Sequence, residues 1–285
     1  MASLKLPDSL VSVDWLKQHL DHENLIILDS SWHMPATGRD AFKEWQQEHI
    51  CGARFFDFDG KIRDPGSALP HMLPSEAIFT REMQALGLNQ DSVVVVYDTM
   101  GMFSSARGWW MLRAMGCENC ALLDGGLVAW DKAEYPIESL VAEPNYAQGN
   151  FVAKMDPGYI VDAPAVLAAL DDDSVAVIDA RPVPRFSGAA DEPRPGLRRG
   201  HMPGALNLPF PDVFEHGLLK PKDELEALIR PLIGSSERAI YSCGSGVTAC
   251  VIAFAAFHIG YDKLAIYDGS WCEWGQPGDL PVVAD

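Results

Sequence analysis

The chain has 285 residues, a length that favours about two domains. Hydrophobic residues make up 48% of it, as in an ordinary globular protein, yet no run approaches the ~18 uncharged apolar residues of a membrane-spanning helix. The net charge of −18 argues against nucleic acid and anionic membranes as partners, because both bind basic surfaces.

In the first half of the chain, short apolar runs alternate with segments of helical character. The run 93–97, Val-Val-Val-Val-Tyr, is the most β-like of the sequence, and the apolar run 25–29 resembles a buried parallel strand. Strands are predicted at 25–29, near Phe55, at 93–97 and at 121–124, and helices at 11–20, 41–49, 79–86, 106–115 and 125–130.

The second half repeats this order. The run 175–179 corresponds to 25–29, and the run 238–241 corresponds to 93–97. A repeat of about 145–150 residues indicates a duplicated domain, since solenoid repeats are only ~20–50 residues long. Strands that alternate with helices predict an α/β fold in which each domain has a mostly parallel sheet flanked by helices.

A stretch between the two halves is predicted to be a linker. It contains Pro136, Pro144 and Pro157 among polar residues. We therefore expect an N-terminal domain over residues 1–140, a linker over 141–158 and a C-terminal domain over 159–285.

The six cysteines favour reduced thiols and a cytoplasmic location, because the N-terminus lacks the apolar core of a secretory signal. Cys117 and Cys120 form a CxxC pair, but the pair follows a glycine typical of a helix C-terminus and leads into a strand, which is the wrong order for a dithiol catalyst. Cys51, Cys250 and Cys272 are interpreted as small apolar residues of the core.

Cys243 lies between a β-rich run, 238–241, and an apolar run of helical character, 249–258. A strand, a glycine-bearing loop and a helix together point backbone N–H groups inward, with a helix N-terminus behind them. Such an arrangement stabilises a thiolate, so Cys243 is predicted to be a nucleophile. A structural cysteine at the end of a buried strand is the alternative, but Gly244 and Gly246 favour a backbone that curls around an anion.

A cysteine-based phosphatase would use a similar loop. Such a loop carries an arginine six residues after the cysteine, which grips phosphate through two hydrogen bonds. That position is Ala249 here, so phosphatase chemistry is disfavoured.

The loop Cys243-Gly-Ser-Gly-Val-Thr resembles the active-site loop of the mercaptopyruvate sulfurtransferases, within the rhodanese superfamily. Thiosulfate-preferring rhodaneses are similar but carry basic residues at the second and third loop positions, where this chain has Gly244 and Ser245. The resemblance extends from about residue 10 to 280 and implies two tandem rhodanese-like domains related by duplication. It also implies a silent N-terminal domain, in keeping with the absence of cysteine from the corresponding loop, 98–107.

The resemblance implies an enzyme that moves the sulfur of 3-mercaptopyruvate through a persulfide on Cys243 and releases pyruvate. The acceptor would be a thiol, such as thioredoxin or a low-molecular-weight thiol, or cyanide. The backbone of Gly244, Gly246, Val247 and Thr248 would hold the bound sulfur. No metal or organic cofactor is expected. The alternatives are a thiosulfate:cyanide sulfurtransferase and a non-enzymatic sulfur-carrier or regulatory rhodanese-like module.

Five arginines lie within residues 181–199, a local positive region in a chain of net charge −18. From spacing alone, a solvated basic loop paired with Asp191 and Glu192 is the simpler interpretation. The family, however, places its substrate-carboxylate arginines in this loop, one before an aromatic residue and one nine residues on. The resemblance therefore implies that Arg185 and Arg194 bind the carboxylate of a small keto acid, and leaves the other three arginines to structural or steering roles.

His71 lies in the sequence His-Met-Leu-Pro of the predicted N-terminal domain, where a surface loop residue is the simpler interpretation. The family has a His-Met-Leu-Pro element there, whose histidine joins an acid and the loop serine in a triad. The resemblance therefore implies that His71 acts with Ser245 and with an acid that falls at Asp59. Asp57 and Asp64 stay open as the acid, because the spacing between Asp59 and His71 departs slightly from the family.

Overall fold

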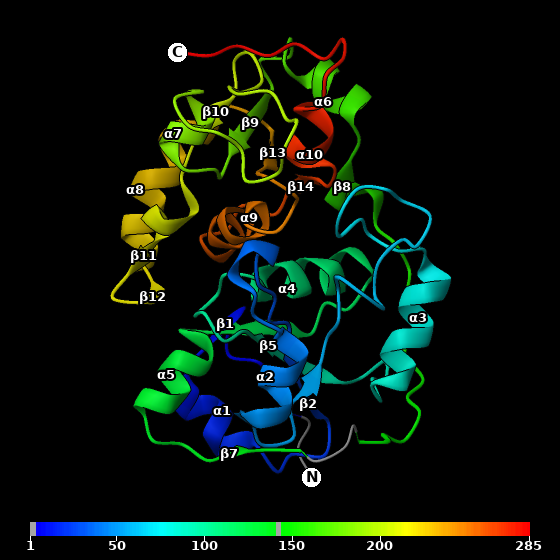
Figure 1. Cartoon of the computed structure of the whole chain (residues 1–285). Helices are drawn as coiled ribbons and strands as arrows, with labels where there is room; N and C mark the ends of the chain where they lie inside the picture. Colours follow the sequence, from blue (N-terminus) through cyan, green and yellow to red (C-terminus); the bar gives the residue numbers. More distant parts are fainter. Residues whose placement is uncertain (1–3, 141–143) are drawn as a thin grey trace. The chain divides into compact units, whose positions relative to one another are not determined.

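The computed structural model describes residues 4–140 and 144–285, which form two compact units (Figure 1). The N-terminal unit comprises the chain up to Asp64 together with Leu73–Met155, and the C-terminal unit comprises Pro65–Met72 together with Asp156–Asp285. Of the linker predicted over 141–158, residues 141–143 lie outside the described residues, whereas residues 144–155 belong to the N-terminal unit.

The N-terminal unit is built on a five-stranded parallel sheet with the order β1-β6-β5-β2-β4. Its strands are β1 (Leu10–Val11), β2 (Leu25–Asp29), β4 (Arg54–Phe55), β5 (Val93–Tyr97) and β6 (Cys120–Leu123), and β3 (His49–Ile50) pairs separately with β7 (Ile137–Glu138). Its α-helices are α1 (Val13–His19), α2 (Ala41–Gln47), α3 (Glu76–Ala85), α4 (Ser105–Ala114) and α5 (Gly126–Lys132).

The C-terminal unit repeats this plan with the strand order β10-β9-β13-β14-β8, again fully parallel. Its strands are β8 (Ile160–Val161), β9 (Val175–Asp179), β10 (Leu206–Asn207), β13 (Arg238–Ser242) and β14 (Leu264–Tyr267), with β11 (Phe214–Glu215) and β12 (Leu218–Leu219) as a separate pair. Its α-helices are α6 (Ala163–Ala169), α7 (Val183–Phe186), α8 (Lys222–Ile233), α9 (Ala249–His258) and α10 (Ser270–Trp274). The predicted duplication of a parallel α/β domain is confirmed.

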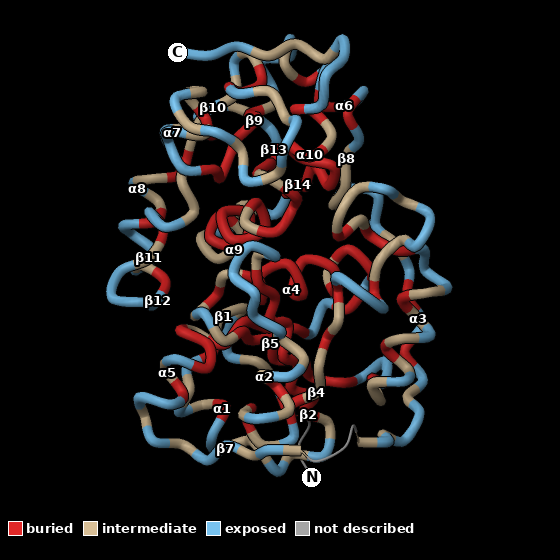
Figure 2. The backbone as a smooth tube through the Cα atoms, viewed as in Figure 1, coloured by how far each residue is buried: buried red, intermediate tan, exposed pale blue. Residues whose placement is uncertain are grey.

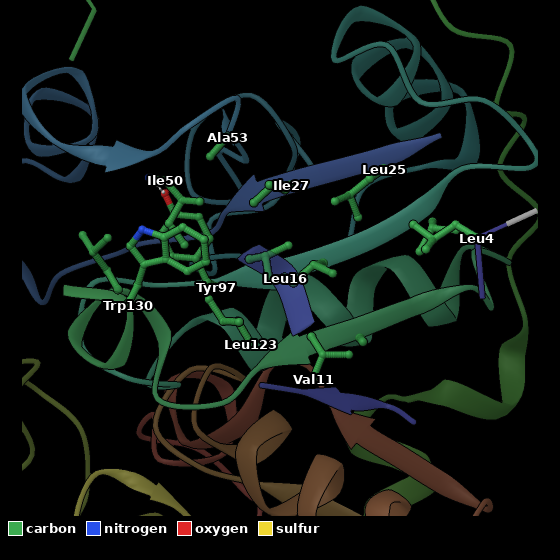
Figure 3. Packing of buried hydrophobic residues seen from close by; sticks show 14 residues of the cluster. Leu4, Val11, Leu16, Leu25, Ile27, Ile50, Ala53, Tyr97, Leu123 and Trp130 are labelled. Atoms are coloured by element: carbon green, nitrogen blue, oxygen red, sulfur yellow. Dashed lines mark hydrogen bonds between the residues drawn. The ribbon is translucent and has the colours of Figure 1, made fainter. Parts of the chain in front are cut away.

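Both faces of the N-terminal sheet are covered by helices, which explains why its central strands are apolar throughout. On one face, Leu16 of α1 and Trp130 of α5 join Ile27 and Tyr97 of the central strands in a single buried cluster (Figure 3). The Tyr97 hydroxyl lies in this cluster and accepts a hydrogen bond from the Ile50 N–H at 3.2 Å. On the other face, α4 lies against β5 and β6.

In the C-terminal unit, the equivalent cluster contains Val166 of α6, Ile240 of β13, and Trp271 and Trp274 of α10. Helix α9 is apolar on all sides and is buried from Ala249 to Ala256, as expected for a helix without a polar face (Figure 2). No helix among the described residues is both long enough and apolar enough to span a bilayer.

Side-chain caps fix where several helices begin. Ser12, Asp40, Ser75 and Asp162 each accept a hydrogen bond from a backbone N–H in the first turn of α1, α2, α3 and α6. The helix predicted over 11–20 therefore begins later than expected, because Val11 pairs with Leu123 in the sheet.

Candidate active site

Cys243 follows the last residue of β13, at the carboxyl end of the parallel sheet, where α/β folds bind ligands. The side of the loop that carries its carbonyl groups is anchored to α10: the Trp271 N–H donates to the Cys243 carbonyl at 3.0 Å, and the Cys272 N–H donates to the Gly244 carbonyl at 2.9 Å. The Cys243 N–H donates to Ser270 Oγ at 3.2 Å, which itself donates to the Tyr267 carbonyl at 2.8 Å. Cys243 is only 2% exposed. These contacts hold the cysteine rigidly at the end of its strand.

The N–H groups on the other side of the loop are left without protein acceptors. Within the described chain, this holds for Ser245, Val247, Thr248 and Ala249, the last of which begins α9. Gly246 allows the turn, because its φ of 75° lies in the left-handed region. Four donors at a helix N-terminus can stabilise a negative charge on sulfur.

The equivalent loop of the N-terminal unit binds an anion through its backbone N–H groups. Register pairs Tyr97 with Asp29 and Ser242 with Asp179, so Asp98 stands where the other unit has Cys243. The Asp98 carboxylate accepts hydrogen bonds from the backbone N–H groups of its own loop: Met100 at 2.8 Å, Met102 at 3.1 Å, Ser104 at 2.8 Å and Ser105 at 2.7 Å. The first copy of the loop is thus an anion cradle filled by its own side chain.

The two loops correspond donor by donor, although the second is one residue shorter. Met100 and Ser245 each lie two residues after the anchor residue, and Met102 and Val247 each lie four after it. Ser105 and Ala249 are the first residues of α4 and α9. The four N–H groups that bind Asp98 are therefore the counterparts of the four that lack a protein acceptor around Cys243.

The basic segment after β9 contains a chain of buried ion pairs. Arg181 donates to Asp179 through Nε at 2.9 Å and Nη2 at 2.7 Å, and to Glu192 through Nη1 at 2.8 Å. Arg185 donates to the same Glu192 through Nε at 3.1 Å and through Nη2. Burial acts to lower the pKa of Arg181, but Asp179 and Glu192 outweigh it and raise that pKa above its usual value. Arg181, for which a structural or steering role is predicted, is thus held in buried ion pairs.

Arg185 reaches the cysteine loop because position 244 has no side chain. A Cβ on Gly244 would lie 2.9 Å from Nη2 of Arg185, closer than an ordinary contact. The arginine predicted to bind the substrate therefore lies directly against the residue that follows Cys243.

Arg194 is half-buried and makes no ion pair or hydrogen bond with a described residue. Its charge acts on the thiol of Cys272. Burial raises the pKa of that thiol to about 11; Arg194 opposes the rise, whereas Cys243 and Glu192 add to it. The charges of Arg194, Arg185 and Cys243 thus all act on the thiol of Cys272, which is buried, as its interpretation as a core residue expects.

The residues of the predicted triad are divided between the units. Ser245 and His71 both belong to the C-terminal unit and are buried, and His71 has a positive φ of 60°. Asp59 belongs to the N-terminal unit, where its carboxylate accepts from the Trp32 indole at 2.9 Å. Asp57, one of the alternatives, accepts from the N–H groups of Gly60 and Lys61 and so caps a turn.

Cys117 and Cys120 are buried free thiols, and the Cys120 thiol donates to the Cys117 carbonyl at 3.2 Å. Burial raises the pKa of Cys120 well above its usual value, so this thiol is a poor nucleophile at neutral pH. In the described part of the chain, no group of three or more His, Cys, Asp or Glu side chains is arranged to hold a metal ion.

Sequence reasoning did not find the roles of Glu192 and Asp98. From spacing alone, Glu192 is expected in a solvated loop, yet its side chain is only 2% exposed. Asp98 could have been found from the alignment of the two repeats, because it occupies the position of Cys243.

Comparison with known proteins agrees with this architecture. The family model of the rhodanese-like domain matches residues 12–133 and again 162–277. A 3-mercaptopyruvate sulfurtransferase of Escherichia coli is 42% identical over 95% of this chain and 96% of its own length. A mitochondrial thiosulfate/3-mercaptopyruvate sulfurtransferase of Arabidopsis thaliana is 40% identical over 99% of this chain and 79% of its own length. The crystal structure of SseA from Escherichia coli, described with the rhodanese fold, superposes with a TM-score of 0.83 at 39% identity and covers 93% of this chain and 99% of that one.

Proposed function

The chain belongs to the rhodanese family, and from this premise we propose that it is a 3-mercaptopyruvate sulfurtransferase that carries sulfur as a persulfide on Cys243. The observation that carries the proposal is the set of four backbone N–H donors around Cys243, whose counterparts in the other unit bind a carboxylate. These donors stabilise first the Cys243 thiolate and then the terminal sulfur of the persulfide.

In the donor step, the Cys243 thiolate attacks the sulfur of 3-mercaptopyruvate and forms the S–S bond. The C–S bond breaks, and its electron pair leaves with the carbon fragment as the enolate of pyruvate. The proton of the donor thiol ends on that carbon, so the products are pyruvate and an anionic persulfide. Arg185 and Arg194 hold the donor carboxylate, which converts the attack into a reaction within one complex.

The proton transfer is assigned to Ser245, with His71 and an acid behind it. In this role Ser245 takes the proton of the donor thiol and delivers it to the enolate carbon. Asp59 stays the proposed acid, with Asp57 and Asp64 as alternatives. Within the N-terminal unit, the Asp59 carboxylate accepts a hydrogen bond from the Trp32 indole.

In the acceptor step, a thiol or cyanide attacks the outer sulfur of the persulfide, and the Cys243 thiolate is regenerated. Cyanide gives thiocyanate; a dithiol such as thioredoxin takes the sulfur as its own persulfide and then expels hydrogen sulfide as its disulfide forms. The dithiol acceptor and a cytoplasmic location remain predictions.

The test compares kcat/KM for 3-mercaptopyruvate and for thiosulfate, first with cyanide and then with a dithiol as the acceptor. We expect a strong preference for 3-mercaptopyruvate. A preference for thiosulfate would keep Cys243 as the sulfur carrier but reject the donor assignment. In parallel, Cys243→Ser should abolish pyruvate release, and retained turnover would remove Cys243 from the mechanism.

A further inference from the structure

Glu192 lies between Arg181 and Arg185 in the series of ion pairs that begins at Asp179, and its side chain is almost fully buried. It accepts from Arg181 through Oε1 at 2.8 Å and from Arg185 Nε at 3.2 Å and 3.1 Å through its two oxygens. A buried carboxylate of this kind is costly to desolvate unless its partners are in place. The position of Arg185 is therefore tied to that of Glu192.

Glu192 is itself held by a fixed partner. Arg181 is fully buried, and Asp179 at the end of β9 engages two of its nitrogens. Its Nη2 also donates to the Gly200 carbonyl at 2.9 Å, and its guanidinium carbon lies 3.9 Å from the centre of the Trp271 ring. This stacking connects the chain of ion pairs to α10, the helix that anchors the Cys243 loop.

The contacts of Arg185 leave one edge of its guanidinium available. Glu192 engages Nε and Nη2, the side edge, and within the described residues Nη1 donates to no protein atom. Nη2 lies beside Gly244, where a Cβ would be 2.9 Å away. The end edge, formed by Nη1 and Nη2, can therefore hold a carboxylate through two hydrogen bonds next to the cysteine loop.

We propose that Glu192 is a positioning residue for the donor: it binds the side edge of Arg185 and so presents the end edge to the donor carboxylate beside Cys243. The inference rests on the function proposed above. Because the charges alternate from Asp179 to Arg185, the four side chains are neutral as a set. At Arg185 a carboxylate donor is therefore selected by the direction of hydrogen bonds, while the excess positive charge of the site comes from Arg194, which stands outside this neutral set.

The test uses two donors that differ only in the group Arg185 would bind. 3-Mercaptopyruvate carries a carboxylate, and mercaptoacetone carries a methyl group in its place, with the same ketone and thiol. In Glu192→Gln, we expect KM for 3-mercaptopyruvate to rise about tenfold with little change in kcat. The kcat/KM for mercaptoacetone should stay within about twofold, so the preference for the carboxylate donor falls by about tenfold. Glu192→Asp keeps the charge but shortens the side chain, and should raise KM in the same direction.

The matched control is Asp191→Asn. Asp191 is an acid of the same loop that pairs with Arg199 on the exposed surface at 2.7 Å, and its removal should leave both donors unchanged. A second test combines substitutions: in an Arg185→Gln background, Glu192→Gln should cause no further rise in KM, because its effect passes through Arg185.

Three results would overturn the proposal: an equal loss with both donors in Glu192→Gln, an unchanged KM for 3-mercaptopyruvate, or additive effects of Glu192→Gln and Arg185→Gln. Failure of the proposed function is separate, because it shows in the unaltered protein as absence of turnover with 3-mercaptopyruvate.

Discussion

Asp98 and Cys243 occupy the same place in the two halves of this chain, each directly after the second of two paired parallel strands. Asp98 presents a carboxylate to four backbone N–H groups, and in the described chain the four equivalent groups of the Cys243 loop have no protein acceptor. The N-terminal copy and the proposed catalytic copy therefore share one arrangement of backbone N–H donors.

Removing the Asp98 carboxylate should destabilise the N-terminal unit. Asp98→Ala leaves four N–H donors without their charged acceptor, and we expect a loss of about 3–5 kcal/mol in the free energy of unfolding, measured in urea. Formate should fill the cradle and raise the midpoint of the variant more than that of the unaltered protein. Asp91→Ala, in an exposed turn, is the control. A loss no larger than that of the control would contradict the assigned role.

A side chain at position 244 should weaken donor binding. In Gly244→Ala, the new Cβ would displace Nη2 of Arg185, and we expect KM for 3-mercaptopyruvate to rise roughly three- to tenfold with little change in stability. Gly278→Ala is the matched control, because no atom lies within 4 Å of the position its Cβ would take. Steady-state kinetics measure the effect, and equal KM values in both variants would reject the contact between Gly244 and Arg185 as a determinant.

The thiol of Cys272 should react slowly at neutral pH. Burial raises its pKa to about 11, so it is protonated at pH 8, and its alkylation by iodoacetamide should accelerate about tenfold per pH unit up to that value. Because the pKa is raised, the protonated Cys272 thiol contributes to the free energy of unfolding below pH 9. This contribution is lost as the pH rises between about 9 and 11. Peptide mass spectrometry after timed alkylation gives the rate, and rapid modification at pH 7 would refute the shift.

Asp29 and Asp179 end equivalent strands, but removing their charges should change the stability of the protein in opposite directions. Burial raises the pKa of Asp29 to about 6, partly offset by hydrogen bonds from Ser31, and no arginine stands at that position as Arg181 does beside Asp179. Because this pKa is raised, the protonated Asp29 carboxyl contributes to the free energy of unfolding below pH ~4, and the contribution is lost as the pH rises through 6.

Asp29→Asn should therefore stabilise the protein at pH 8, by up to about 2 kcal/mol, whereas Asp179→Asn breaks a buried pair and should cost about 3–5 kcal/mol. Urea unfolding of the two variants at pH 8 and at pH 5 provides the comparison. The gain of Asp29→Asn should shrink at pH 5, and a gain independent of pH would contradict the assigned cause.

The sequence predicted those elements whose apolar runs are continuous. Strands 25–29, 93–97 and 175–179 and helix 249–258 are found at the predicted residues, because a run buried on all sides leaves little choice of boundary. Helix α8 was not predicted, although it is one of the longer helices, because no side chain caps its start and Pro231 lies inside it.

The site was predictable only where a single residue carries the signal. Cys243 was predictable because the glycines beside it, Gly244 and Gly246, form a recognisable loop sequence. Glu192 has none, because its role depends on two arginines that lie seven and eleven residues before it in the sequence. What decides that role is burial and the direction of hydrogen bonds, and neither can be read from spacing. Its neighbour Asp191, of the same type, forms only an exposed pair.

The filled cradle around Asp98 has a consequence for the history of duplicated enzymes. When a duplicated loop of this kind has no anionic side chain or ligand, its inward-facing backbone amides are buried without hydrogen-bond acceptors, which is costly. An acidic residue at the position equivalent to the nucleophile satisfies these amides with one side chain, as Asp98 does in the N-terminal unit. A loop without the nucleophile can thus keep the arrangement of its backbone amides. In other duplicated folds, a carboxylate bound by the amides of its own loop would mark the position equivalent to the active site of the other copy.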